Sequence, residues 1–133
     1  MNWIRGLCLL SLLVVSPAWA ADVVKTILGT GLVVAGDATP TSAVVLPAGS
    51  KSIYGSVTGT GAVTQTQKIY SGLVSTFTPT VDGVLLCTLT LSGTTTAVDQ
   101  CPVITAAGMF YKVVTSATTG TGATGVVTSQ HSF

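Results

Sequence analysis

The feature that most constrains this chain is a repeated alternation of short Val- and Thr-rich runs with turns that contain glycine or proline. The sequence holds 23 Thr and 15 Gly and lacks Glu, so strong helix formers are scarce. β-Branched residues favour a pleated surface. Short runs at roughly ten-residue spacing predict one all-β domain, a single antiparallel β-sandwich of jelly-roll or immunoglobulin-like type.

The runs predict nine strands. The tripeptide Gly-Thr-Gly occurs at 29–31, 59–61 and 120–122, and we expect each copy at a hairpin tip, because glycine accepts the positive φ of tight turns. The predicted strands are Val23–Leu28, Leu32–Ala35, Ala43–Leu46, Ser52–Thr58, Ala62–Tyr70, Val84–Leu91, Val98–Thr105, Phe110–Ser116 and Thr124–Ser129.

The first twenty residues have the pattern of a secretory signal peptide. A short charged start ends at Arg5, an apolar run follows at Leu7–Val15, and Ala-Trp-Ala ends at Ala20. The run is shorter than the roughly 20 residues of a membrane span. We expect a signal-peptide helix over 1–20, cleaved between Ala20 and Ala21, and an exported protein without a stable membrane span. The alternative is an N-terminal helix that is buried or anchors the chain.

The domain that remains, residues 21–133, is almost free of charge. Its four Lys and four Asp cancel, and Arg5 leaves with the signal peptide. Nucleic-acid binding needs a cationic surface, so this partner is not expected. A neutral β-rich surface has little electrostatic protection against self-association, which predicts other copies or other structural proteins as partners.

Two cysteines remain in the domain, Cys87 and Cys101. Export to an oxidising compartment and an even count predict a disulfide. A hairpin centred on Thr94 places the two residues opposite each other, within bonding reach. The alternative is two buried free thiols.

Catalytic motifs are not found. The single histidine, His131, lies in the terminal segment, where we expect a frayed tail rather than a catalytic base. Metal sites need three or four suitable ligands, and glycosidases need two close acids. The Gly49-Ser50-Lys51-Ser52 segment lacks the first glycine of a phosphate loop and is interpreted as a turn. We therefore expect no enzyme activity, no metal and no cofactor.

The aromatic residues give the one candidate binding surface. Tyr54, Tyr70 and Tyr111 are candidates for stacking on a ligand, and the alternative is that they pack in the core. Phe110 and Tyr111 point to opposite faces of one strand, and we expect Tyr111 to be the exposed member.

The later part of the chain, roughly residues 44–128, resembles small Thr/Gly-rich β-sandwich proteins of tailed-phage virions and prophages. The motifs that carry the resemblance are Leu46-Pro47-Ala48-Gly49, Tyr70-Ser71-Gly72, the run LCTLTLSGT from Leu86, the run FYKVVTS from Phe110 and the run TGTGATGVV from Thr119. The resemblance implies a β-sandwich and a structural role in an assembly. The signal peptide departs from this pattern, since virion proteins assembled in the cytoplasm do not normally carry one.

Two functions follow from these observations. The first is a non-enzymatic structural subunit, phage-virion-like, that self-associates through neutral β surfaces and is virion-associated. The alternative is an exported adhesin or extracellular fibre subunit that binds a surface ligand. In either case the apolar run Val23–Leu28 pairs within its own sheet or is donated to the next subunit.

The signal peptide gives a direct prediction. N-terminal sequencing of the exported protein should begin at Ala21, because the small residues before it fit the cleavage site. A product that retains Met1 would show that residues 1–20 are not a cleaved signal.

Overall fold

The computed structural model describes residues 23–33, 41–47, 49–102, 104 and 110–132. The signal peptide and its cleavage point therefore lie outside the described residues. The regular elements of the described part are strands with antiparallel pairing, which confirms the all-β prediction. They are β1 (Val23–Leu32), β2 (Val44–Val45), β3 (Lys51–Gly72), β4 (Val84–Gly93), β5 (Thr96–Gln100) and β6 (Phe110–Ser132).

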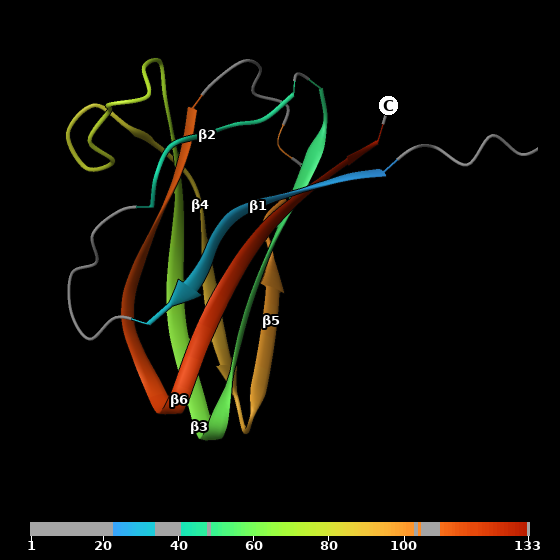
Figure 1. Cartoon of the computed structure of the whole chain (residues 1–133), viewed down its shortest axis with the longest axis vertical. Helices are drawn as coiled ribbons and strands as arrows, with labels where there is room; N and C mark the ends of the chain where they lie inside the picture. Colours follow the sequence, from blue (N-terminus) through green and yellow to red (C-terminus); the bar gives the residue numbers. More distant parts are fainter. Residues whose placement is uncertain (1–22, 34–40, 48, 103, 105–109, 133) are drawn as a thin grey trace, which may run out of the picture.

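The fold is built on one long antiparallel ribbon formed by β3 and β6. The two strands pair from Lys51↔His131 to Gly72↔Phe110, and both bend at the same end of the molecule (Figure 1). Each strand thereby divides into two arms. The arms of β3 are 51–58 and 64–72, and those of β6 are 110–119 and 124–132.

Folding the ribbon over itself produces two layers. In layer I the order is β1, the second arm of β6, the first arm of β3, and β5. In layer II the order is β2, the first arm of β6, the second arm of β3, and β4. Two facing four-stranded layers wound from one ribbon form a jelly roll, which is the first of the two predicted sandwich types.

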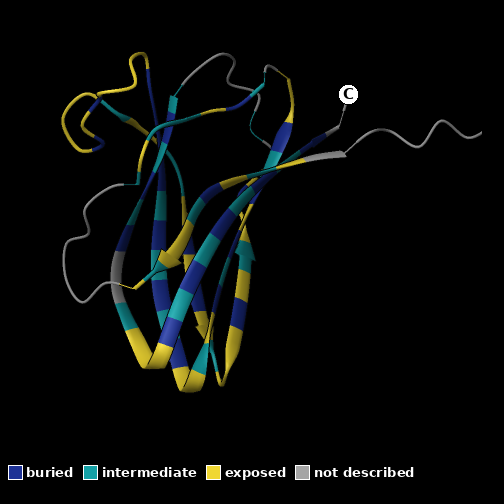
Figure 2. Ribbon diagram, in the orientation of Figure 1, coloured by how far each residue is buried: buried dark blue, intermediate teal, exposed yellow. Residues whose placement is uncertain are grey.

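The sequence produces this arrangement because alternate residues of both long strands are suited to the interior. Along the arms of β3 and β6 the buried positions are mostly odd-numbered, and the even-numbered residues between them are more exposed (Figure 2). Two apolar clusters result. The larger contains Leu28, Leu46, Ile53, Ile69, Leu89, Cys101, Tyr111, Val113 and Val127; the smaller, near the bends, contains Val57, Val63, Leu91, Ala97 and Ala123.

A polar contact joins the layers within this interior. Gln65 and Gln67 of layer II are almost fully buried, and Gln67 Nε2 donates to Gln65 Oε1 at 2.6 Å. Gln65 Nε2 also donates to the backbone oxygen of Leu32 at 2.7 Å, in layer I. A Cβ atom added to Gly55 or Gly125 would overlap the amide oxygen of Gln67 or Gln65 respectively, so glycine at both positions makes room for the glutamines.

Several predicted strands are longer or merged. The predicted pairs 52–58 with 62–70 and 110–116 with 124–129 are each one bent strand, because the hydrogen-bonded ladder between β3 and β6 resumes after each bend. Val84–Leu91 and Ala43–Leu46 are found as β4 and β2 with shifted ends. Val98–Thr105 is replaced by β5, followed by a single bridge between Ile104 and Lys51. Leu32 ends β1, and Val34 and Ala35 lie outside the described residues.

The prediction that Gly-Thr-Gly marks hairpin tips is wrong. All three copies lie within strands, and two of them form the bends of β3 and β6. Gly61, Gly120 and Gly122 have φ values of 78°, 106° and 62°, which L side chains rarely adopt. The glycines thus turn a strand from one layer into the other.

Both ends of the described chain are held in the fold by strand pairing. β1 pairs with the second arm of β6 of its own chain. Of the two predicted placements of the run Val23–Leu28, this structure therefore has pairing within its own sheet. His131 was expected in a frayed tail, and this is wrong. It is only 3% exposed and pairs with both Val24 and Lys51, because the second arm of β6 is a central strand.

The contact between Gly125 and Gln65 gives a test of the layer packing. Gly125→Ala should lower the free energy of unfolding by about 1–3 kcal/mol, since the added methyl group meets a buried amide. In a Gln65→Ala background the same change should cost much less. Urea unfolding of the four proteins measures both values, and an equal cost in both backgrounds would contradict the proposed contact.

Candidate functional site

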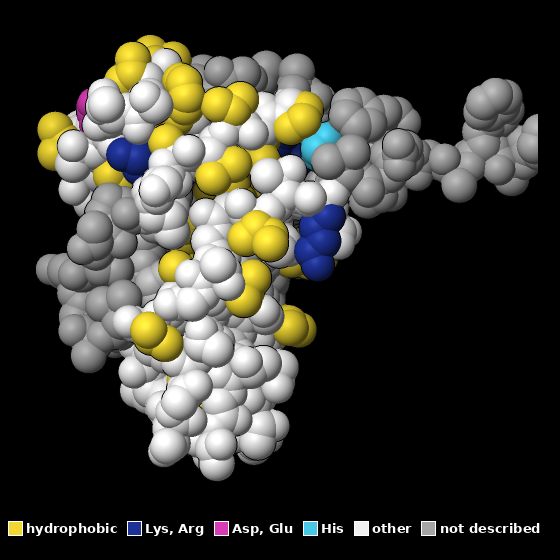
Figure 3. Space-filling model, in the orientation of Figure 1, with side chains coloured by type: hydrophobic (Ala, Val, Ile, Leu, Met, Phe, Trp, Pro, Cys, Tyr) yellow, Lys and Arg dark blue, Asp and Glu magenta, His cyan; other side chains and the backbone are white. Residues whose placement is uncertain are grey.

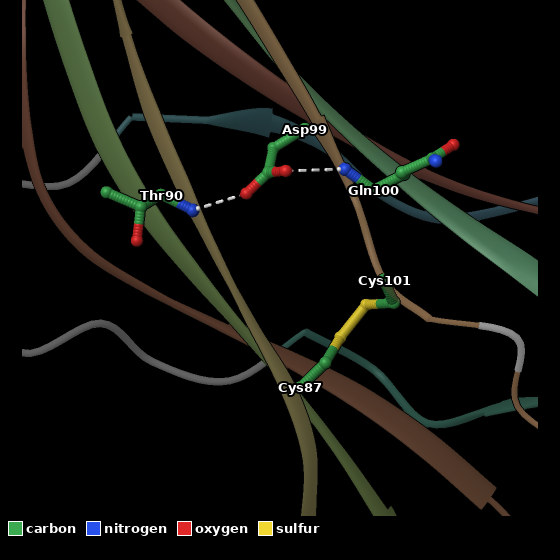
Figure 4. Close-up of a disulfide and its surroundings, with 5 residues drawn as sticks. All are labelled: Cys87, Thr90, Asp99, Gln100 and Cys101. Carbon is green, nitrogen blue, oxygen red and sulfur yellow. Dashed lines mark hydrogen bonds between the residues drawn. A yellow bond between two sulfur atoms is a disulfide. The ribbon is translucent and has the colours of Figure 1, made fainter.

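The predicted disulfide between Cys87 and Cys101 is present, with the two Cα atoms 5.9 Å apart. Its geometry differs from the predicted cross-strand pair. β4 pairs with the second arm of β3 and β5 with the first, so the bond connects the edges of the two layers (Figure 4). Closing a loop of this size in the unfolded chain contributes roughly 3 kcal/mol. A disulfide is typical of a non-reducing, exported environment.

Asp99 reinforces the same edge. Its carboxylate accepts a hydrogen bond from the backbone N–H of Thr90 in β4 at 2.9 Å and another from the N–H of Gln100 at 2.8 Å (Figure 4). An edge strand has unpaired N–H groups that invite pairing with another chain. Asp99 accepts a hydrogen bond from one of these groups, the N–H of Thr90, so that group is no longer available to another chain. The sequence pattern did not indicate this role.

The three tyrosines of the predicted binding surface do not lie on one surface. Tyr111 is fully buried and Tyr70 is 8% exposed, so the prediction that Tyr111 is the exposed member of its pair is wrong. Tyr111 is in phase with Val113 and Thr115, which face the interior from the same arm of β6. Of the three, Tyr54 alone is exposed, at 37%.

Tyr54 lies in a shallow pocket on the outer face of layer I. The pocket has a volume of about 300 Å³ and is lined by Tyr54, Val98, Asp99 and Gln100. Tyr54 and Gln100 are direct partners on β3 and β5, so neighbouring hydrogen-bonded strands hold the two side chains together. Val98 is 76% exposed.

The loop between β3 and β4 has a fixed internal structure. Phe77 is 1% exposed, and its backbone oxygen accepts a hydrogen bond from Lys112 Nζ at 2.6 Å. The Lys112 ammonium also lies 4.8 Å from the centre of the Phe77 ring. The backbone oxygen of Thr78 accepts from three N–H groups, and Asp82 accepts from the Thr78 N–H at 2.5 Å.

This ordered loop presents apolar side chains to solvent. Leu73 and Val81 are 79% and 82% exposed, and neighbouring apolar residues extend the surface onto the start of β4. Hydrophobic side chains gather over this end of the molecule (Figure 3). We call this surface the loop patch; it consists of Leu73, Val74, Val81, Val84 and Leu85.

A buried basic and aromatic cluster lies between the layers, away from the bends. Lys51 is 1% exposed, its Nζ donates to the backbone oxygen of Gly49 at 2.9 Å, and it lies 5.8 Å from the centre of the Tyr111 ring. Burial lowers the pKa of Lys51 and raises the pKa of Tyr111. His131 is the partner of Lys51 across the ribbon.

No three His, Cys, Asp or Glu side chains among the described residues group together in a way that would hold a metal ion. The same residues contain no helix of the length and apolarity needed to cross a membrane.

The buried lysine predicts a pH dependence of stability. Because the pKa of Lys51 is lower in the folded chain than its usual 10.5, the unfolded chain binds more protons than the folded chain as the pH rises towards 10.5. Lys51 should therefore contribute a rise in the free energy of unfolding over this range, and the raised pKa of Tyr111 opposes that rise as the pH nears 10.0. Lys51→Met keeps the apolar stem and should remove the rise. Urea unfolding at several pH values below 10.5 tests this, and a parallel rise in both proteins would rule Lys51 out as its source.

Comparisons with known proteins give a limited result. No family model matches the chain, and no curated protein matches it. The chain is similar to a chain in the solved structure of infectious bursal disease virus, Gx strain, with a TM-score of 0.37 and 14% identity. The match covers 84% of this chain and 32% of that chain, so this chain spans about a third of its length.

Proposed function

We propose that this protein is a non-enzymatic structural subunit, virion-like in its role, that associates with further copies of itself through the loop patch. The observation that carries the proposal is an ordered loop with large apolar side chains facing solvent. Leu73 and Val81 are each about 80% exposed on a segment that Phe77 anchors in the core.

The order of the loop favours association. Binding through a mobile segment costs conformational entropy for every side chain and backbone unit that becomes fixed. Here the hydrogen bonds to Thr78 and the contact between Lys112 and Phe77 already fix the loop in the single chain. Most of the free energy gained by burying the apolar side chains is therefore available for binding.

The charge of the patch supports a second copy as the occupant. The five patch residues are uncharged, and the carboxylate of Asp82 beside them is engaged by the Thr78 N–H. The patch residues themselves therefore give no electrostatic preference for a charged partner and do not repel an identical patch, and the exposed carboxylate of Asp82 lies at their margin. Exposed apolar surface of this kind marks interaction sites in soluble proteins.

The test compares the patch with an exposed valine outside it. Sedimentation velocity at increasing micromolar concentrations should show oligomers of the purified protein. Leu73→Ser with Val81→Ser should shift the population to monomer, with association weakened at least about tenfold, since two exposed apolar contacts are lost.

The matched control is Val98→Ser, which changes a 76% exposed valine on another face. It should leave association unchanged. Thermal unfolding should be similar for all proteins, because these side chains do not support the core. A wild-type protein that stays monomeric throughout, or a control that weakens association as much as the patch variant, would overturn the proposal.

A further inference from the structure

We propose that the pocket at Tyr54 binds a neutral hexopyranose, the kind of sugar ring presented by surface polysaccharides. The proposal does not depend on self-association through the loop patch. It rests on the residues that line the pocket, on their fixed spacing and on the charge among them.

The pocket offers a stacking surface beside a hydrogen-bonding group. The ring of Tyr54 is partly exposed, and Val98 extends the apolar surface next to it. One face of a pyranose ring carries only C–H groups and packs against such a surface. Gln100, the cross-strand partner of Tyr54, supplies an amide that both donates and accepts hydrogen bonds at the edge of the same pocket.

The surroundings also suit a ligand rich in hydroxyl groups. Thr128 of β6 is the cross-strand partner of Tyr54 on the side away from β5. Ser56 of β3 is the cross-strand partner of Val98. These residues are half-buried and face outward in phase with the pocket residues. A sugar larger than one ring therefore extends over a face of hydroxyl side chains.

The charge of the lining excludes an anionic ligand. The lining residues include no Lys, Arg or His, and Asp99 is the single charged residue among them. A phosphate, a nucleic acid or an acidic sugar would find no cationic partner there. The Asp99 carboxylate already accepts two backbone hydrogen bonds, so it is less suited to pairing with a ligand cation.

The size of the pocket sets the expected affinity. Its volume of about 300 Å³ lies at the lower end of the range for small-molecule sites and matches one sugar ring. For so small a ligand in an open site we expect a Kd of about 1 mM.

The experiment is a ¹H–¹⁵N NMR titration of the purified protein with the methyl glycosides of glucose, galactose and mannose, each to about 50 mM, well above that Kd. At least one glycoside should shift the amides of Tyr54, Val98 and Gln100 along a saturating curve. Tyr54→Ala should weaken binding by about tenfold, and Tyr54→Phe should retain it, because the stacking ring remains.

Ile27→Ala is the matched control, since Ile27 is exposed on the same outer face but does not line the pocket. It should bind like the wild-type protein, and the amide spectrum away from the pocket should show that each variant is folded. The proposal is overturned by an absence of saturable shifts with all three glycosides, or by a Tyr54→Ala variant that binds normally. Tetramethylammonium is titrated as a second probe, because a tyrosine ring can also bind a quaternary ammonium cation. Shifts at the pocket with this cation but not with the sugars would likewise overturn the proposal.

Discussion

The contact between two glutamines and two glycines is the constraint on which the arrangement of the layers depends. Gln65 and Gln67 project from layer II, and the absence of a side chain at Gly55 and Gly125 in layer I lets their amides pass into the space between the layers. A hydrogen bond between layers depends strongly on register, whereas packing of valines against valines tolerates small slips. The polar contact therefore fixes how the folded ribbon closes, and the apolar clusters on either side supply the bulk of the burial.

The sequence was sufficient to predict the fold class, the single disulfide and most strand positions. Local composition determines these, because Val, Thr and glycine act on the backbone near them. It did not predict that two pairs of strands are continuous, since glycine within a bent strand has the same local pattern as glycine in a hairpin. The burial of Tyr111 and His131 was missed for a related reason. Both depend on which face of β6 meets the other layer, and the alternation in FYKVVTS is equally consistent with either face.

The sequence predicted one residue of the Tyr54 pocket, whereas it did not predict the loop patch. Tyr54 was among the predicted aromatic residues, although the residues beside it come from a strand about 45 positions away, and only the register of β3 and β5 brings them together. The loop patch was not predicted, because apolar residues in a turn segment are ordinarily expected to be buried. Phe77 satisfies that expectation and holds its apolar neighbours at the surface.

The position of β6 has a consequence for the order in which the protein folds. It is the last described strand in the sequence, yet it lies between β1 and β3 in layer I and between β2 and β3 in layer II. Neither layer is complete until residues 110–132 are available, and the pairing of β1 with β6 joins segments from opposite ends of the described chain. Because a chain is synthesised from its N-terminus, this topology postpones completion of both layers until the final strand has been made.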